Sequence, residues 1–114
     1  MRSTIKTALS FLATGGLLAL AAGNVNAGGV SDQEILIGTH FDLSGPVSST
    51  QPHLRYGTQM RIDEANAAGG VNGRKLKLIV EDNAYSAQQA VRVVQKLIQK
   101  DEVFALLNPF GSGT

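Results

Sequence analysis

The 114-residue sequence contains no cysteine and no tryptophan, and only 17% of its residues are charged. Without cysteine, the chain can form no disulfide, no thiolate metal site and no cysteine nucleophile, and it has no N-terminal cysteine for lipid attachment. The formal net charge of +1 excludes a strongly basic nucleic-acid arm and an acidic disordered tail. The 13 glycines lack a collagen-like period, so they favour a loop-rich α/β chain of one small domain at most.

The first 27 residues have the pattern of a secretory signal peptide. Arg2 and Lys6 precede an apolar stretch at 8–22, and the segment ends in Val25-Asn26-Ala27. We therefore expect export to a bacterial periplasm and cleavage after Ala27. A transmembrane anchor is disfavoured, because this stretch is shorter than the roughly 20 residues that span a bilayer. Cleavage would leave 87 of the 114 residues, with eight basic and nine acidic side chains and a net charge of −1.

Beyond this segment, the sequence alternates between strand and helix patterns. Continuous apolar runs predict strands buried on both faces at 34–39 and in the core at 103–108, and 74–81 predicts a third strand that enters the core. A helix is expected from Pro52, a favoured first-turn residue, to Ala68, where Gly69-Gly70 would end it. Its apolar stripe is thin and consists of Leu54, Thr58, Ile62 and Ala65.

Two further local features complete the pattern. Gly57 lies inside the first helix, which indicates either a close packing contact or a helix that begins later. Ser86 is a good N-cap for a second helix. One apolar face is predicted for that helix, made up of Ala87, Ala90, Val91, Val94, Leu97 and Ile98.

The element order β-α-β-α-β predicts an α/β fold with parallel strands and right-handed crossovers. In such sheets ligands bind outside the carboxyl ends of the strands. The chemistry is therefore expected in the loops 42–51 and 82–86 and in the turn 109–114. The 69–73 loop would lie at the opposite edge, and as a helix stop followed by a turn it does not fit a dinucleotide fingerprint.

Gly111-Ser112-Gly113-Thr114 follows the last predicted strand and would open a helix. Backbone N–H groups in this position bind carboxylate or phosphate groups. An ordinary glycine turn explains the residues equally well, so both interpretations stay open.

No catalytic, metal-binding or cofactor-binding residues are predicted. His40, Asp42 and Ser44 lack a nucleophile elbow and are better explained as a polar loop. Glu81-Asp82 could ligate a metal or act as acid and base, but charged residues that leave a buried strand for solvent are commoner. Lys75 and Lys77 alternate along one strand, as on a solvated edge, and do not indicate nucleic-acid binding.

Several stretches, in order and with similar spacing, resemble one family, and the resemblance covers essentially all of the chain after residue 27. The family is the type I periplasmic solute-binding proteins of the branched-chain amino acid (leucine/isoleucine/valine-binding) branch. The stretches are 35–38 (ILIG), 43–46 (LSGP), 66–76 (NAAGGVNGRKL), 81–83 (EDN), 87–91 (AQQAV) and 103–107 (VFALL).

The resemblance implies a two-lobed receptor that closes on an amino acid or similar small organic acid and delivers it to an ABC transporter's membrane permease. Residues 28–114 would be the N-terminal part of the first lobe, truncated inside a β-α unit. In this family the turn after the third strand holds the ligand's charged groups. This implies binding by Ser112 and the amides of Gly111, Gly113 and Thr114, with Ser44 and Thr50 contributed by the first loop.

The sequence departs from the leucine-type receptors at three positions. Gly111 and Gly113 stand in a turn that is richer in serine there, and Thr50 stands where those receptors place an aromatic residue. These departures leave leucine-like specificity open. One alternative is a periplasmic ligand-sensing domain of the same fold. Another is a nucleotide-dependent enzyme, which the export signal disfavours.

Overall fold

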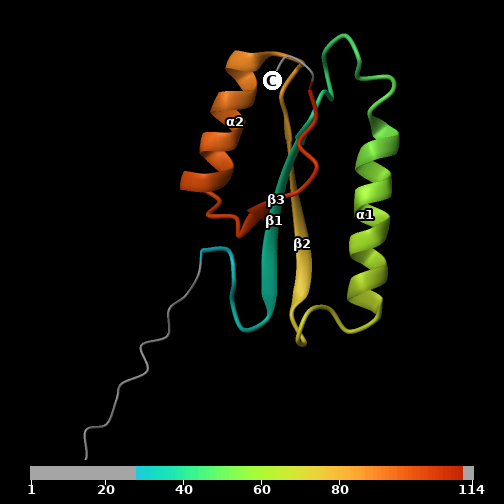
Figure 1. The fold of residues 1–114 in the computed structure, drawn as a ribbon, viewed down its shortest axis with the longest axis vertical. Helices are drawn as coiled ribbons and strands as arrows, with labels where there is room; N and C mark the ends of the chain where they lie inside the picture. Colours follow the sequence, from blue (N-terminus) through green and yellow to red (C-terminus); the bar gives the residue numbers. More distant parts are fainter. Residues whose placement is uncertain (1–27, 112–114) are drawn as a thin grey trace, which may run out of the picture.

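The computed structural model describes residues 28–111, in which a three-stranded parallel sheet lies between two helices (Figure 1). The predicted α/β class and parallel strands are confirmed. The predicted signal peptide with its cleavage site at Ala27, and residues 112–114, lie outside the described residues. The elements in chain order are β1 (Glu34–Phe41), α1 (Pro52–Ala67), β2 (Lys75–Asp82), α2 (Ala87–Gln99) and β3 (Ala105–Leu106).

β1 is the central strand, and the sheet order is β2-β1-β3. β1 and β2 pair along their full length, from Glu34 opposite Lys75 to Phe41 opposite Asp82. Both strands therefore end at the same level, and the loops that follow them share one edge of the sheet. Gly38–Phe41 are buried, whereas the first half of β1 is only half-buried, so the predicted burial on both faces holds for the carboxyl half alone.

α1 begins at Pro52, as predicted, and ends at Ala67. Gly69 and Gly70 follow with φ of 108° and 75°, a conformation that glycine adopts without strain. Thr58 and Ile62 are the buried residues of this helix. A side chain at Gly57 would meet open space, so Gly57 marks neither a close contact nor a late helix start.

α2 is capped by Ser86 as predicted, and the Ser86 hydroxyl accepts a hydrogen bond from the Gln89 amide at 3.4 Å. Its predicted apolar face is partly wrong. Ala90, Val93 and Leu97 are buried, whereas Val91 and Ile98 are 58% and 55% exposed. The predicted face also included Ala87, which is exposed, and omitted Val93. The apolar stripe is wider than the strip that contacts the sheet, so pattern alone could not locate its centre.

The strand predicted at 103–108 is much shorter and less buried than expected. β3 spans only Ala105–Leu106, and Phe104 is 56% exposed. β3 lies at the edge of the sheet, and no described strand pairs with its outer side. The segment nevertheless follows β1, because the Leu107 amide donates to the Gly38 carbonyl at 2.9 Å and the Phe110 amide to the His40 carbonyl at 3.1 Å.

Candidate functional site

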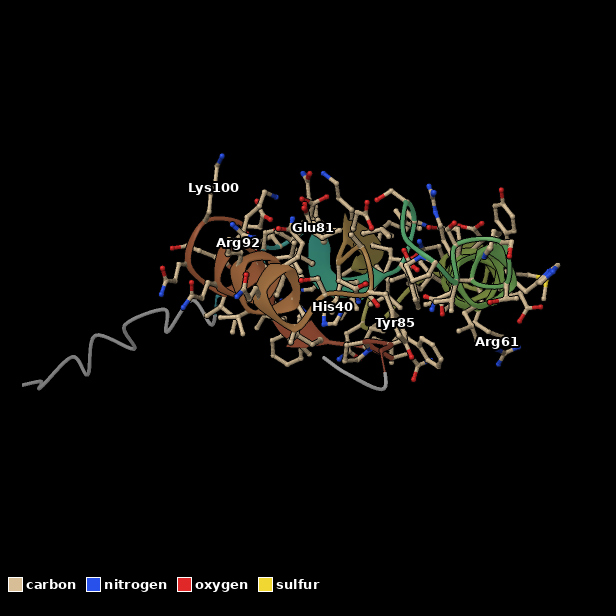
Figure 2. The ribbon with its side chains drawn as sticks, turned by 90° about the horizontal axis from the view of Figure 1, so that it is seen from above. His40, Arg61, Glu81, Tyr85, Arg92 and Lys100 are labelled. Carbon is tan, nitrogen blue, oxygen red and sulfur yellow. The ribbon has the colours of Figure 1, made fainter. Side chains whose placement is uncertain are left out.

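Three loops meet at the carboxyl edge of the sheet: 42–51 after β1, 83–86 after β2 and 107–111 after β3. Figure 2 looks onto this edge, with His40, Glu81 and Tyr85 labelled between the two helices. The edge is the one that the element order predicted. Its polar side chains bond mostly to backbone groups, and these bonds fix the loops relative to one another.

Asp42 shapes the first loop from within. Its carboxylate is fully buried and accepts hydrogen bonds from the backbone amides of Gly45 and Val47, the latter at 2.8 Å. The Asp42 amide donates to the Gln51 side-chain oxygen at 2.9 Å. Gln51 is also buried, and its side-chain nitrogen has no hydrogen-bond partner among the described residues. The loop is thus folded around one buried carboxylate, directly before α1.

Asp82 ties the first loop to the second. Its carboxylate accepts hydrogen bonds from the Leu43 amide at 2.9 Å, the Ala84 amide at 2.8 Å and the Ser44 hydroxyl at 2.5 Å. Burial raises the pKa of Asp82, but these hydrogen bonds outweigh it, so the pKa lies below the ordinary value. The interpretation of Asp82 as a charge that leaves the strand for solvent is therefore wrong. Its neighbour Glu81 pairs with Lys96 on α2 at 2.6 Å.

The same two loops make a close backbone contact at Gly45. A Cβ atom there would lie 2.6 Å from the Ala84 carbonyl oxygen, closer than any real contact allows. Ala84 and Tyr85 themselves have φ of 47° and 54°. Two consecutive non-glycine residues in this region are strained, and such strain persists only where surrounding bonds over-determine the backbone. Glycine at position 45 is what lets the loops approach.

Asn83 ties the second loop to the third. Its side chain is fully buried, and its amide nitrogen lies 2.8 Å from His40 Nδ1 and 2.8 Å from the Phe110 carbonyl oxygen. Its side-chain oxygen accepts from the Tyr85 amide at 2.8 Å. One side chain therefore connects the end of β1, the β2 loop and the turn after β3. Burial lowers the pKa of His40, because a charged imidazole would lose solvation there.

The structure describes three of the predicted ligand-binding residues. Ser44 and Thr50 are exposed, and their hydroxyls donate to Asp82 and, at 2.9 Å, to the Val47 carbonyl. Each hydroxyl oxygen keeps lone pairs that can accept a hydrogen bond from a solute. Gly111 is half-buried and directly follows Phe110, which Asn83 holds. Ser112, Gly113 and Thr114 lie outside the described residues.

The polar residues at this edge do not form a catalytic or metal-binding arrangement within the described part. Ser44 bonds to Asp82, whereas His40 bonds to Asn83, so the two are not linked as nucleophile and base. Within 28–111, no three His, Cys, Asp or Glu side chains gather closely enough to hold a metal ion. In the same range, no helix is long and apolar enough to cross a membrane.

An apolar groove of about 820 Å³ lies beside the edge, between α1 and the segment 107–110. Ser44 and Thr50 do not line it. Solute sites in general combine apolar walls with a few convergent polar groups, and here those groups belong to the loops. The apolar side chains that line the groove are Phe41, Leu54, Ile62, Leu76, Leu107, Pro109 and Phe110.

The sequence did not reveal the roles of Gln51 and Asn83. Asp42 lies in the predicted polar loop but is buried, whereas His40 lies in β1 and Asp82 bonds to the first loop instead of facing solvent. All five are buried or half-buried, and four of them bind backbone groups at strand ends. One signal was present: Asp42 directly follows the first long strand, and Asp82 and Asn83 stand at the end of the second. Such side chains characteristically bond to nearby backbone amides.

The chain is a parallel α/β unit whose polar loops are bound together at the carboxyl edge, which is where such sheets bind ligands. Comparison with known proteins identifies the class of protein. The chain belongs to the periplasmic binding protein family, whose model matches residues 34–114. This family consists of solute-binding proteins rather than enzymes, and the described sheet has the fold of its type I members.

Three similar proteins illustrate the relationship. The amino acid binding protein of Pseudomonas aeruginosa is 33% identical over 102 residues, which cover 87% of this chain and 27% of that protein. The branched-chain amino acid transporter substrate binding protein of Streptococcus pneumoniae, solved with isoleucine, is 31% identical with a TM-score of 0.64 over 68% of this chain and 22% of that one. The fatty acid ABC transporter substrate-binding protein of Thermomonospora curvata is 30% identical with a TM-score of 0.63, and the match covers 70% of this chain and 20% of that one.

The chain thus spans about a quarter of the length of the curated relatives it matches. The matched region is the part that contains the three loops. The chain therefore corresponds to one portion of such a binding protein.

Proposed function

We propose that this chain forms the N-terminal part of the first lobe of an ABC transporter substrate-binding protein, which captures an amino acid or similar small organic acid. One observation carries the proposal: Asp82 and Asn83 bind the loops after all three strands into a single edge, at the place where such folds bind ligands. The family match over residues 34–114 supports it. The activity is reversible binding, with no chemical step and no cofactor.

The relatives suggest a carboxylate as the feature common to the solutes. One solved neighbour holds isoleucine, and another is a fatty acid transporter protein. Both kinds of solute carry a carboxylate, whereas only the first carries an ammonium group. We propose that the backbone amides of Gly111, Gly113 and Thr114, together with the Ser112 hydroxyl, hold this carboxylate at the turn after β3. The hydroxyl oxygens of Ser44 and Thr50, in the first loop, would accept hydrogen bonds from a donor group of the solute, such as an ammonium group.

Binding would work by closure of two lobes around the solute. Contacts that the solute makes with both lobes stabilise the closed state over the open one. The closed receptor would then be presented to the transporter's membrane permease. The hydrogen bonds of Asp42, Asp82 and Asn83 would hold the loops 42–51, 83–86 and 107–110 in place before the solute arrives, which would reduce the ordering cost of binding.

A thermal-shift screen of the full-length gene product tests the proposal. Amino acids, amides, fatty acids and aromatic acids form the panel. A bound solute should raise the melting temperature, because a ligand at 100 times its Kd stabilises the folded state by about 2.7 kcal/mol. A panel in which no compound raises the melting temperature would overturn the proposal.

Ser112→Ala should weaken solute binding by about 1–2 kcal/mol, because the hydroxyl would no longer meet a charged group of the solute. Calorimetric titration with the best compound from the screen measures the change. Ser31→Ala is the matched control, since Ser31 lies before β1, at the opposite end of the sheet. Unchanged affinity in Ser112→Ala would remove this residue from the site.

We further propose that residues 1–27 direct export and are removed after Ala27. N-terminal sequencing of the protein recovered from the periplasm should begin at Gly28. Recovery of a mature protein that retains Met1 would contradict this.

A further inference from the structure

The buried side chains of His40 and Asn83, with the backbone carbonyl of Phe110, have a single consistent arrangement of hydrogens. The Asn83 side-chain oxygen faces the Tyr85 amide, which is a donor. Its nitrogen must therefore face His40 Nδ1 and the Phe110 carbonyl, using one N–H for each. His40 Nδ1 is then an acceptor, so the imidazole is neutral and carries its hydrogen on Nε2.

We propose that His40 and Asn83 are positioning residues that add a side-chain hydrogen bond to the turn after β3 while the imidazole is neutral and withdraw it when the imidazole is protonated. A proton on Nδ1 would turn an acceptor into a donor, directly opposite the N–H of Asn83. If the Asn83 amide rotated to offer its oxygen instead, it would give up its hydrogen bonds to the Tyr85 amide and the Phe110 carbonyl. The turn would then lose the hydrogen bond that connects it to Asn83.

The charged groups around His40 leave this switch undisturbed. Glu81 pairs with His40 in the β1–β2 register, but its carboxylate bonds to Lys96 at 2.6 Å. Lys96 also bonds to Asp101 at 2.7 Å. The residues through which α2 packs on the sheet are apolar, namely Ala90, Val93 and Leu97.

The loops on the remaining sides add few titratable groups. Asp42 bonds to the amides of Gly45 and Val47, and Asp82 bonds to the first loop. The segment 107–110 contains no titratable side chain. Geometry and burial therefore favour the neutral form, which agrees with the lowered pKa of His40.

The lowered pKa of His40 determines how the turn should respond to pH. The folded-state pKa of His40 lies below its ordinary value of 6.5. Above pH 6.5 the imidazole is therefore neutral and the hydrogen bonds of Asn83 to His40 and Phe110 are present; they are lost as the pH falls through the folded-state pKa. If the turn binds the solute, as the proposed function requires, affinity should fall below that pKa. One proton limits the decrease to about tenfold per pH unit.

An NMR titration of the isotope-labelled chain from pH 8 to 4 tests the switch without any solute. The His40 ring and the Phe110 amide, which donates to the His40 carbonyl, should shift with one common midpoint below pH 6.5. In His40→Gln, the side-chain oxygen can still accept from Asn83 but cannot titrate, so the Phe110 midpoint should disappear. In His53→Gln, which removes the exposed histidine on α1, the midpoint should remain.

A Phe110 amide that does not follow the His40 ring would overturn the proposal, as would a Phe110 midpoint that survives in His40→Gln. If His40→Gln fails to fold, the common midpoint in the unmodified chain still decides. A second experiment measures solute affinity against pH in the full-length protein. If the switch operates but no solute binds at any pH, the proposed function fails and the switch stands.

Discussion

Replacing Asn83 with alanine should lower the free energy of unfolding by about 3 kcal/mol, because it removes three hydrogen bonds made by a fully buried side chain. Asn83 is fully buried, and its side chain bonds to His40, to the Phe110 carbonyl and to the Tyr85 amide. Each buried polar group left without a partner costs about 1–3 kcal/mol. Urea unfolding at pH 7.5, where His40 is neutral, measures the change.

Gln88→Ala is the matched control, since Gln88 carries the same amide group on the exposed side of α2. Its substitution should change stability by no more than about 0.5 kcal/mol. If Asn83→Ala cost as little as the control, Asn83 would not be what connects the three loops. The account of the carboxyl edge as a single bound unit would then be wrong.

Leu97→Ala should also be strongly destabilising, by about 3 kcal/mol, because it opens a cavity in the core. Leu97 is completely buried, and its Cδ1 atom lies 3.3 Å from where a Cβ on Gly38 of the central strand would be. Leu97 therefore packs closely against the central strand, and its truncation would remove these contacts. Denaturant unfolding followed by circular dichroism measures the loss.

Ile98→Ala provides the control on the next residue of the same helix. Ile98 is 55% exposed, so its truncation should cost less than about 1 kcal/mol. The two residues belong to one apolar face in the sequence pattern, and only the structure separates them. Equal costs for Leu97→Ala and Ile98→Ala would show that the burial of α2 differs from that described.

Local features of the sequence were sufficient to predict most of the framework. Pro52 begins α1 and Ser86 caps α2, because both effects depend on a few neighbouring residues. The long strands were found within two residues at either end, since a continuous apolar run needs no tertiary information. The site loops could be located because parallel strands end at the same edge.

The internal bonds of the site could not be predicted in this way. Asp82 bonds to the Leu43 amide 39 positions away, and Asn83 to the Phe110 carbonyl 27 positions away. A periodic pattern does not indicate contacts between residues so far apart in the sequence. Asp82, an acidic residue at a strand end, was therefore predicted to face solvent. The prediction that 103–108 is a buried strand was wrong for a related reason. The burial of an edge strand depends on neighbouring elements that its own sequence does not specify.

The central claim is that a small organic acid binds at the carboxyl edge of this lobe. A crystal structure of the full-length protein with the best solute from the screen tests it most directly. The account predicts the solute's carboxylate against residues 111–114, with Ser44 and Thr50 beside it. A solute bound elsewhere, such as in the apolar groove between α1 and 107–110, would contradict it.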